Sequence, residues 1–134
     1  MANVKPYRWL AKYYDEFFGP FRAPLDAARE TLLRPVMAGV HSACDLACGT
    51  GTTALKFAAR GIETYAVDLS PAMYREVRAK ARSAGLRVRV ARGDMRTFRL
   101  PAAVDLITCE SDALNHVERK SDLAKVARSA RIWA

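Results

Sequence analysis

Apolar and polar positions follow strand-like and helix-like patterns in turn from about His41 onward. Short apolar or strictly alternating runs predict four strands, at residues 42–47, 62–67, 86–91 and 103–109. Helical spacing between them predicts helices over 52–60, from Pro71 to about Ser83, and over 121–132, and Ser70 and Ser121 are suitable N-caps for the last two. Strands that alternate with helices predict an α/β fold with a parallel sheet and helices on its faces.

The first 40 residues carry a different, purely helical pattern. Residues 5–18 predict an aromatic-rich amphipathic helix that Gly19-Pro20 breaks, and residues 24–38 predict a second helix with Pro24 at its start. Pro35 is expected to shorten or kink that second helix. We therefore expect an N-terminal helical cap over residues 1–40 and a core over residues 41–134, together forming one domain.

Composition narrows the classes of protein. The chain has 134 residues and a formal net charge of +8, but its basic residues are spread along the sequence, with the densest stretch between Arg75 and Arg99. Nucleic-acid binding is therefore the weaker interpretation. Three cysteines, an odd number, do not indicate a disulfide framework, and their spacing predicts no metal site. No apolar run approaches the ~20 residues of a membrane span, so we expect a soluble, cytoplasmic protein that does not bind membranes.

Acidic residues stand where the predicted strands end. In a parallel sheet these carboxyl ends meet at one edge, where ligands bind. The first strand also leads into a glycine-rich turn that contains Gly49 and Gly51, whose lack of a side chain lets the backbone approach a ligand closely. The acidic residues at these ends are Asp45, Asp68, Asp94, Glu110 and Asp112.

Two ligands have to be compared for such a site. Gly49-x-Gly51-x-x-Ala54, with Asp68 19 residues after Gly49, fits a dinucleotide-binding fingerprint and hence a dehydrogenase. However, Asp45 directly before the turn would repel a pyrophosphate. S-adenosylmethionine, with a sulfonium, an ammonium and one carboxylate, suits the acidic cluster better. Asp68 could accept hydrogen bonds from two ribose hydroxyls, Asp94 from the adenine amine, and Asp45 from the ammonium group.

Four consecutive segments resemble the motifs of class I S-adenosylmethionine-dependent methyltransferases. These segments are DLACGTGT at 45–52, VDLSPAMYREVRAKA at 67–81, GDMRTF at 93–98 and VDLITCESDALNHV at 104–117. The segment KYYDEFF at 12–18 is similar to the helical cap of the small-molecule enzymes in that family. The resemblance implies a Rossmann-like sheet with strand order 3-2-1-4, the later strands of the family being absent from this sequence.

The resemblance also implies roles for individual residues. The loop from Asp45 to Gly51 would hold the methionine moiety, although Ala47 stands where glycine is commoner. Tyr14 would contact the methionine carboxylate, or would simply be a core aromatic residue of the first helix. The full set of implied cofactor-binding residues is Tyr14, Asp45, Ala47, Gly49, Thr50 and Gly51 for the methionine end, Asp68 for the ribose, Leu69, Asp94 and Met95 for the adenine, and Glu110 and Ser111 beside the sulfonium.

The implied reaction is an in-line displacement in which a small-molecule acceptor takes the sulfonium methyl group. A general base is optional in such a reaction, and His116 and Asp112 are the candidates, against ordinary roles as a surface histidine and a loop acid. Two other functions stay open: an RNA or protein methyltransferase that uses the basic surface, and a noncatalytic S-adenosylmethionine-binding remnant.

The family's sheet has seven strands, whereas this sequence predicts four. We therefore expect a fragment of a longer protein, or a chain that completes itself as a homo-oligomer by strand pairing through the exposed edge of residues 103–109. An isolated monomer is expected to bind S-adenosylmethionine weakly and to turn over poorly.

Overall fold

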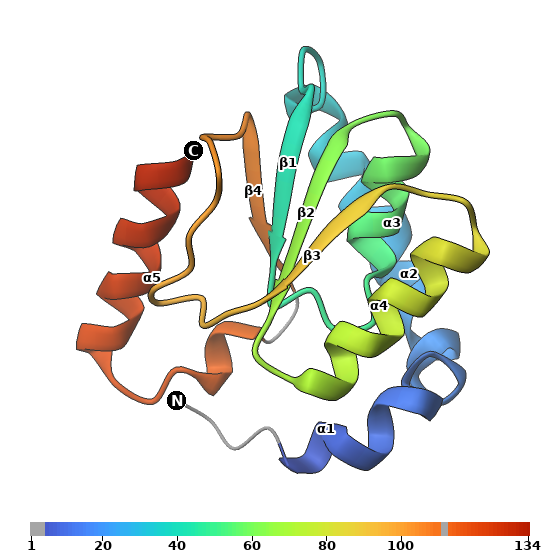
Figure 1. Cartoon of the computed structure of the whole chain (residues 1–134). Helices are drawn as coiled ribbons and strands as arrows, with labels where there is room; N and C mark the ends of the chain where they lie inside the picture. The colour runs from blue at the N-terminus through green and yellow to red at the C-terminus, as the bar shows by residue number, and fades with distance from the viewer. Residues whose placement is uncertain (1–4, 111–112) are drawn as a thin grey trace.

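A parallel four-stranded sheet forms the centre of the molecule in the computed structural model, which describes residues 5–110 and 113–134 (Figure 1). The strands are β1 (Ser42–Leu46), β2 (Glu63–Asp68), β3 (Val88–Arg92) and β4 (Leu106–Cys109). They lie in the order β3-β2-β1-β4, and every pairing is parallel. The predicted Rossmann-like topology is confirmed, although β3 and β4 are shorter than their apolar runs suggested.

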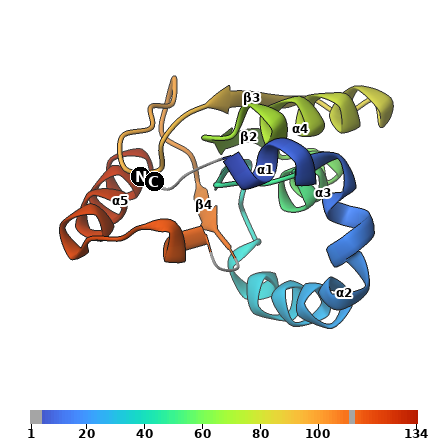
Figure 2. The same ribbon diagram turned by 90° about the horizontal axis from the view of Figure 1, so that it is seen from below.

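Helices cover both faces of the sheet (Figure 2). On one side α3 (Thr52–Ala59) and α4 (Pro71–Ser83) pack through Ala54 and Val77 against Ala66 of β2. On the other side α5 (Lys120–Trp133) contributes Val126 to the larger core cluster, which contains Cys44, Leu46, Tyr65 and Val67 of the strands. The central strands are therefore apolar on both faces, as expected for a parallel sheet between helical layers.

The N-caps were predicted with mixed success. The Ser70 hydroxyl accepts a hydrogen bond from the Met73 backbone N–H at 3.4 Å, and Pro71 occupies the first turn of α4, as predicted. The prediction of Ser121 as the N-cap of α5 is wrong. That helix already begins at Lys120, and its N-cap residue, Arg119, makes no side-chain capping hydrogen bond.

The predicted helix break at Gly19-Pro20 is also wrong. After α1 (Lys5–Leu10) and a 3₁₀ turn, α2 runs unbroken from Tyr14 to Leu33 with Pro20 and Pro24 inside it. A proline has no N–H group, so the carbonyl oxygen four residues earlier lacks its helical donor. In α2 these carbonyl groups belong to Glu16 and Pro20. Both of those residues are exposed, so water can take the place of the missing donors. The expectation that Pro35 shortens the helix agrees with the structure: α2 ends at Leu33, and Pro35 lies in the short 3₁₀ turn that follows (Arg34–Val36).

The cysteines are free thiols, in agreement with the sequence prediction. β1 and β4 are neighbours, but the register pairs Cys109 with Leu46 and not with Cys44. Cys44 is therefore a diagonal neighbour of Cys109 on the same face of the sheet.

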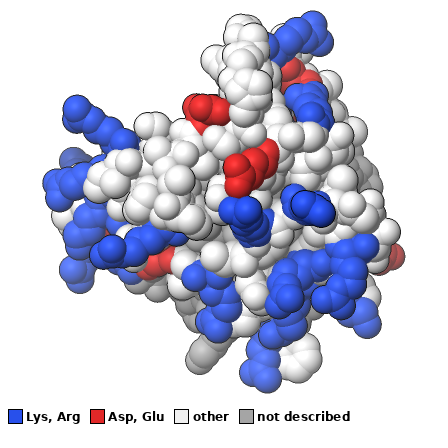
Figure 3. Space-filling view, turned by 45° about the horizontal axis from the view of Figure 1, so that its top comes forward, with Lys and Arg blue, Asp and Glu red and all other residues white. Residues whose placement is uncertain are grey.

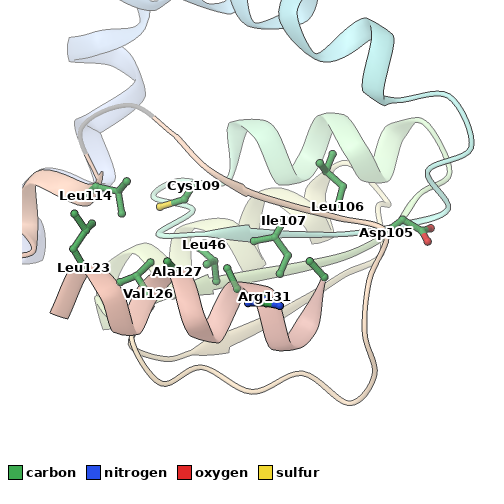
Figure 4. Close-up of a pocket in the computed structure, with 12 residues that line it drawn as sticks. Leu46, Asp105, Leu106, Ile107, Cys109, Leu114, Leu123, Val126, Ala127 and Arg131 are labelled. Carbon is green, nitrogen blue, oxygen red and sulfur yellow. The ribbon is translucent and has the colours of Figure 1, made fainter. Parts of the chain in front are cut away.

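The outer edge of β4 borders an apolar pocket of about 480 Å³ between this strand and α5 (Figure 4). Ile107, Cys109 and Leu46 point into it from the sheet, and Leu123 and Val126 from the helix. Within the described ranges β4 pairs with β1 alone. Self-association through this edge stays a prediction.

None of the helices described is long and apolar enough to span a membrane.

Gly51 is required by both conformation and space. Its φ is +87°, and an added Cβ would lie 2.8 Å from Cγ1 of Val77, which is fully buried. Gly61 has a similar φ of +78°, but a Cβ added there would meet nothing within 4 Å, so Gly61→Ala isolates the backbone strain. In urea denaturation we expect Gly61→Ala to lower the unfolding free energy by about 1 kcal/mol and Gly51→Ala to lower it by about 3 kcal/mol. The difference arises because the added methyl group at Gly51 is overpacked against Val77. Equal costs would show that Val77 does not restrict this position.

Candidate functional site

The carboxyl ends of the four strands lie at one edge of the sheet and carry the acidic residues that the sequence singled out. Asp45 lies near the end of β1 and Asp68 at the end of β2, while Asp94 follows β3 and Glu110 follows β4. The parallel order places Asp45 and Asp68 on the two adjacent central strands. The acids come together because the strands are parallel, although they are far apart in sequence.

The turn after β1 has an unusual backbone. Ala47, Gly49 and Gly51 have φ values of +50°, +58° and +87°, so three of five consecutive residues are left-handed. For alanine this conformation costs roughly 1 kcal/mol, which explains why glycine would be the easier residue at position 47. A Cβ at Gly49 would meet nothing within 4 Å, so the backbone there faces open space. The turn leads directly into the N-terminus of α3 at Thr52.

Asp68 connects β2 to this turn. One carboxylate oxygen accepts the Gly49 backbone N–H at 2.9 Å, and the other accepts the Ser70 backbone N–H at 2.8 Å. The carboxylate therefore stabilises both the glycine turn and the start of α4 in addition to any role toward a ligand. Leu69, the neighbouring residue, is half-buried.

Asp45 is a buried acid. Its carboxylate accepts a hydrogen bond from the Thr108 hydroxyl at 2.8 Å. Burial raises its pKa from the ordinary value of 3.8 to about 7, and the nearby Glu110 charge adds to this, against the lowering effect of Thr108. A carboxyl group that titrates near neutral pH at a strand end is a typical feature of a functional site.

Asp94 already has a strong partner within the chain. Arg96 donates to both carboxylate oxygens, from Nε at 3.0 Å to one and from Nη2 at 2.6 Å to the other. This hydrogen bond is the largest cause of the lowered pKa of Asp94. Met95 between them is buried in the core cluster beside Phe98, so its side chain belongs to the packing of the sheet.

Glu110 lies within a polar cluster that the sequence did not reveal. One of its oxygens, Oε2, accepts from Arg29 of α2 at 2.9 Å and from the Thr53 hydroxyl of α3 at 3.0 Å. The other oxygen, Oε1, is buried and has no hydrogen-bond partner within the described part of the chain. Arg29 Nη2 lies 2.9 Å from Asp26 Oδ1, an ion pair that lacks hydrogen-bond geometry.

The remaining predicted residues differ in how far the structure places them. Tyr14 is half-buried at the start of α2, packs against the Ala11–Met73 cluster and lies 4.7 Å from the Phe18 ring, measured between ring centroids. The Thr50 hydroxyl donates to Asp15 of α2 at 2.6 Å. Ser111 and Asp112 fall outside the described residues. His116 ends a 3₁₀ turn (Ala113–His116), and its side chain is likewise not described.

The charges of the molecule are unevenly distributed. Figure 3 brings forward the upper end of Figure 1, opposite the strand tips, and shows basic side chains in several separate places with few acidic ones. The face drawn in Figure 3 therefore carries more basic than acidic side chains. Among the described side chains, no group of three or more could hold a metal ion.

A Rossmann-like parallel sheet with a glycine turn after its first strand and acids at its strand ends defines the class of nucleotide- and cofactor-binding α/β proteins. The family model of the methyltransferase domain matches residues 43–132, and the chain belongs to this family.

Individual relatives agree with this assignment. A putative methyltransferase of Geobacillus sp. (strain WCH70) is 27% identical over 121 residues, which are 87% of this chain and 48% of the relative. An S-adenosylmethionine-dependent methyltransferase from Clostridium acetobutylicum is similar in structure, with a TM-score of 0.75 and 29% identity, over 90% of this chain and 52% of that one. CalS10, an amino pentose methyltransferase from Micromonospora echinaspora solved with S-adenosylmethionine bound, has a TM-score of 0.69 and 27% identity, over 80% and 44%. The chain thus spans about half the length of these relatives.

Proposed function

We propose that this chain binds S-adenosylmethionine at the carboxyl ends of its strands and contributes to methyl transfer to a small-molecule acceptor. The observation that carries the proposal is the set of carboxylates around the left-handed glycine turn: Asp45, Asp68 and Glu110. A cationic ligand with one nucleoside suits this set, whereas a pyrophosphate would be repelled by it.

The methionine end fits the polar groups near β1 and β4. Glu110 Oε1 is a buried acceptor without a hydrogen-bond partner among the described residues, and the ammonium group would supply the missing donors. Asp45 adds a second carboxylate nearby, and the open backbone at Gly49 leaves room for close approach. Tyr14 and the N–H groups in the first turn of α3, which its N-cap residue Gly51 does not cap through a side chain, would contact the methionine carboxylate.

The nucleoside end fits the residues after β2 and β3. Asp68 would accept hydrogen bonds from the ribose hydroxyls, since it ends β2 beside the glycine turn and a carboxylate oxygen can accept more than one hydrogen bond. Leu69 would border the adenine, together with the backbone at Met95, whose side chain is buried in the core. Asp94 would accept from the adenine amine while it shares its oxygens with Arg96.

Bound S-adenosylmethionine would supply a methyl group that is already activated for in-line displacement. The chain's own contribution is then to align the reactants and to exclude water. Asp112 and His116 remain the candidates for a general base, and Ser111 for a contact beside the sulfonium. A small-molecule acceptor is supported by the amino pentose substrate of CalS10.

Asp68→Ala tests the placement of the cofactor. Loss of charge-assisted hydrogen bonds worth roughly 1.5–3 kcal/mol should weaken S-adenosylmethionine binding by about tenfold or more in isothermal titration calorimetry. Asp68→Asn keeps an acceptor for the Gly49 N–H, so its affinity for S-adenosylmethionine should lie between those of the wild type and Asp68→Ala.

Glu63 provides the matched control because it is an exposed acid at the opposite end of the same strand. Glu63→Gln should bind like the wild type. If Asp68→Ala folds cooperatively and binds with wild-type affinity, Asp68 does not belong to the site.

A further inference from the structure

Helix α2 is attached to the rest of the molecule in an unusual way. It has 20 residues, none of which is buried, and it exposes large apolar side chains such as Phe17 and Phe21. Its contacts with the sheet domain include polar contacts at both ends, made by Asp15 near the N-terminus and by Arg29 and Glu30 near the C-terminus. Because apolar packing of α2 is confined to partly buried residues such as Tyr14 and Leu33, its attachment can depend strongly on these few polar side chains.

Asp15 connects three elements at one carboxylate. Its Oδ1 accepts the Thr50 hydroxyl at 2.6 Å and lies 3.3 Å from Arg22 Nη1. Its Oδ2 accepts from Lys80 Nζ of α4. Lys80 also donates to the Thr50 carbonyl oxygen at 3.1 Å. Thr50 is thus bound through its side chain by α2 and through its backbone by α4.

Thr50 occupies a critical place in the glycine turn. It is 2% exposed and stands between Gly49 and Gly51, both of which are left-handed. Two flanking glycines make such a turn conformationally permissive, so without external contacts it would sample many conformations. Contacts that restrict a binding loop to one conformation before the ligand arrives increase affinity because less ordering remains to be done.

We propose that Asp15 and Lys80 are positioning residues that act through Thr50 to hold the glycine turn in the conformation that binds the methionine end of S-adenosylmethionine. This inference rests on the proposed function of the site. Neither residue has to touch the ligand. The cap helix and α4 would both contribute to affinity through the one threonine that they share.

The test compares Asp15→Ala, Lys80→Met and the double variant in calorimetric titrations with S-adenosylmethionine. Each single change should weaken binding by about fivefold, and the double variant should be little weaker than either, because both changes release the same turn. Lys80→Arg keeps a cationic donor and should restore most of the affinity. Glu30→Gln, which breaks the exposed pair with Arg60 at the far end of α2, should leave affinity unchanged.

Urea denaturation of the same variants separates positioning from general stability. Unchanged affinity in folded Asp15→Ala and Lys80→Met would overturn the inference, whatever their stability. Additive losses in the double variant would also overturn it, since independent roles would then be shown. If the wild type itself does not bind S-adenosylmethionine, the proposed function fails, and that result is distinct from the other two.

Discussion

Between about pH 4 and pH 8, Asp45→Asn is expected to retain about 4 kcal/mol of unfolding free energy that the wild type loses. Burial raises the pKa of Asp45 from 3.8 to about 7, so the folded protein holds this proton where the unfolded chain has released it. Because the folded state binds more protons in that window, wild-type stability falls as pH rises through it. Urea denaturation of both proteins at pH 4 and pH 8 measures the difference.

Other carboxylates act in the opposite direction and outside this window. The pKa of Asp105 is lowered, mainly by hydrogen bonds from the backbone N–H groups of His41 and Ser42, so its contribution is lost only as pH falls below about 4. Asp105→Asn is therefore the control and should keep the wild-type loss between pH 4 and pH 8. An identical pH dependence in wild type and Asp45→Asn would contradict the raised pKa. An acid that destabilises the free protein near neutral pH is explained if a cationic ligand compensates for it.

Arg29→Met is expected to destabilise the protein by about 3 kcal/mol. The Arg29 and Glu110 side chains are only 16% and 22% exposed, and they meet at 2.9 Å. Methionine keeps most of the aliphatic stem but leaves Glu110 with the Thr53 hydroxyl as its partner, close to Asp45. The cost arises from a carboxylate left without its counter-charge in a largely desolvated place.

Arg60→Met is the matched control for this loss. Arg60, which follows α3, pairs at 2.6 Å with Glu30 of α2, the helix that also carries Arg29. The two side chains are 47% and 36% exposed, so removal of Arg60 should lower the unfolding free energy by under about 1 kcal/mol. Adding Glu110→Gln to Arg29→Met should recover part of the loss in urea denaturation, because the uncompensated charge is removed. Equal losses for Arg29→Met and Arg60→Met would show that the Glu110 pair is as solvated as a surface pair.

The local pattern of apolar and polar residues was enough to predict the parallel sheet and the glycine turn. The acids at the strand ends could be brought together from sequence because parallel strands place their carboxyl ends at one edge, and Ser70-Pro71 marked the start of α4 by local chemistry alone. The strand lengths were less accurate. The apolar run at 103–109 predicted a longer strand than β4 because it includes Val104, which is buried but lies before the strand begins at Leu106.

The contacts that α2 makes with the rest of the molecule could not be predicted from local sequence patterns. A break expected at Gly19-Pro20 concealed the single helix that carries both Asp15 and Arg29, and hence their contacts with Thr50 and Glu110. Those partners lie 35 and 81 residues away, and no local pattern encodes such pairings. The Arg96–Asp94 pair is only two residues apart, but whether an arginine turns back on a nearby acid depends on the loop conformation.

The central claim is that the acidic strand ends select S-adenosylmethionine. Isothermal titration calorimetry of the wild-type chain with S-adenosylmethionine and, separately, with NADH tests it most directly. We expect saturable binding of S-adenosylmethionine at one site and no heat of binding from NADH over the same concentration range. Binding of NADH without binding of S-adenosylmethionine would contradict it and would make the glycine turn a dinucleotide site.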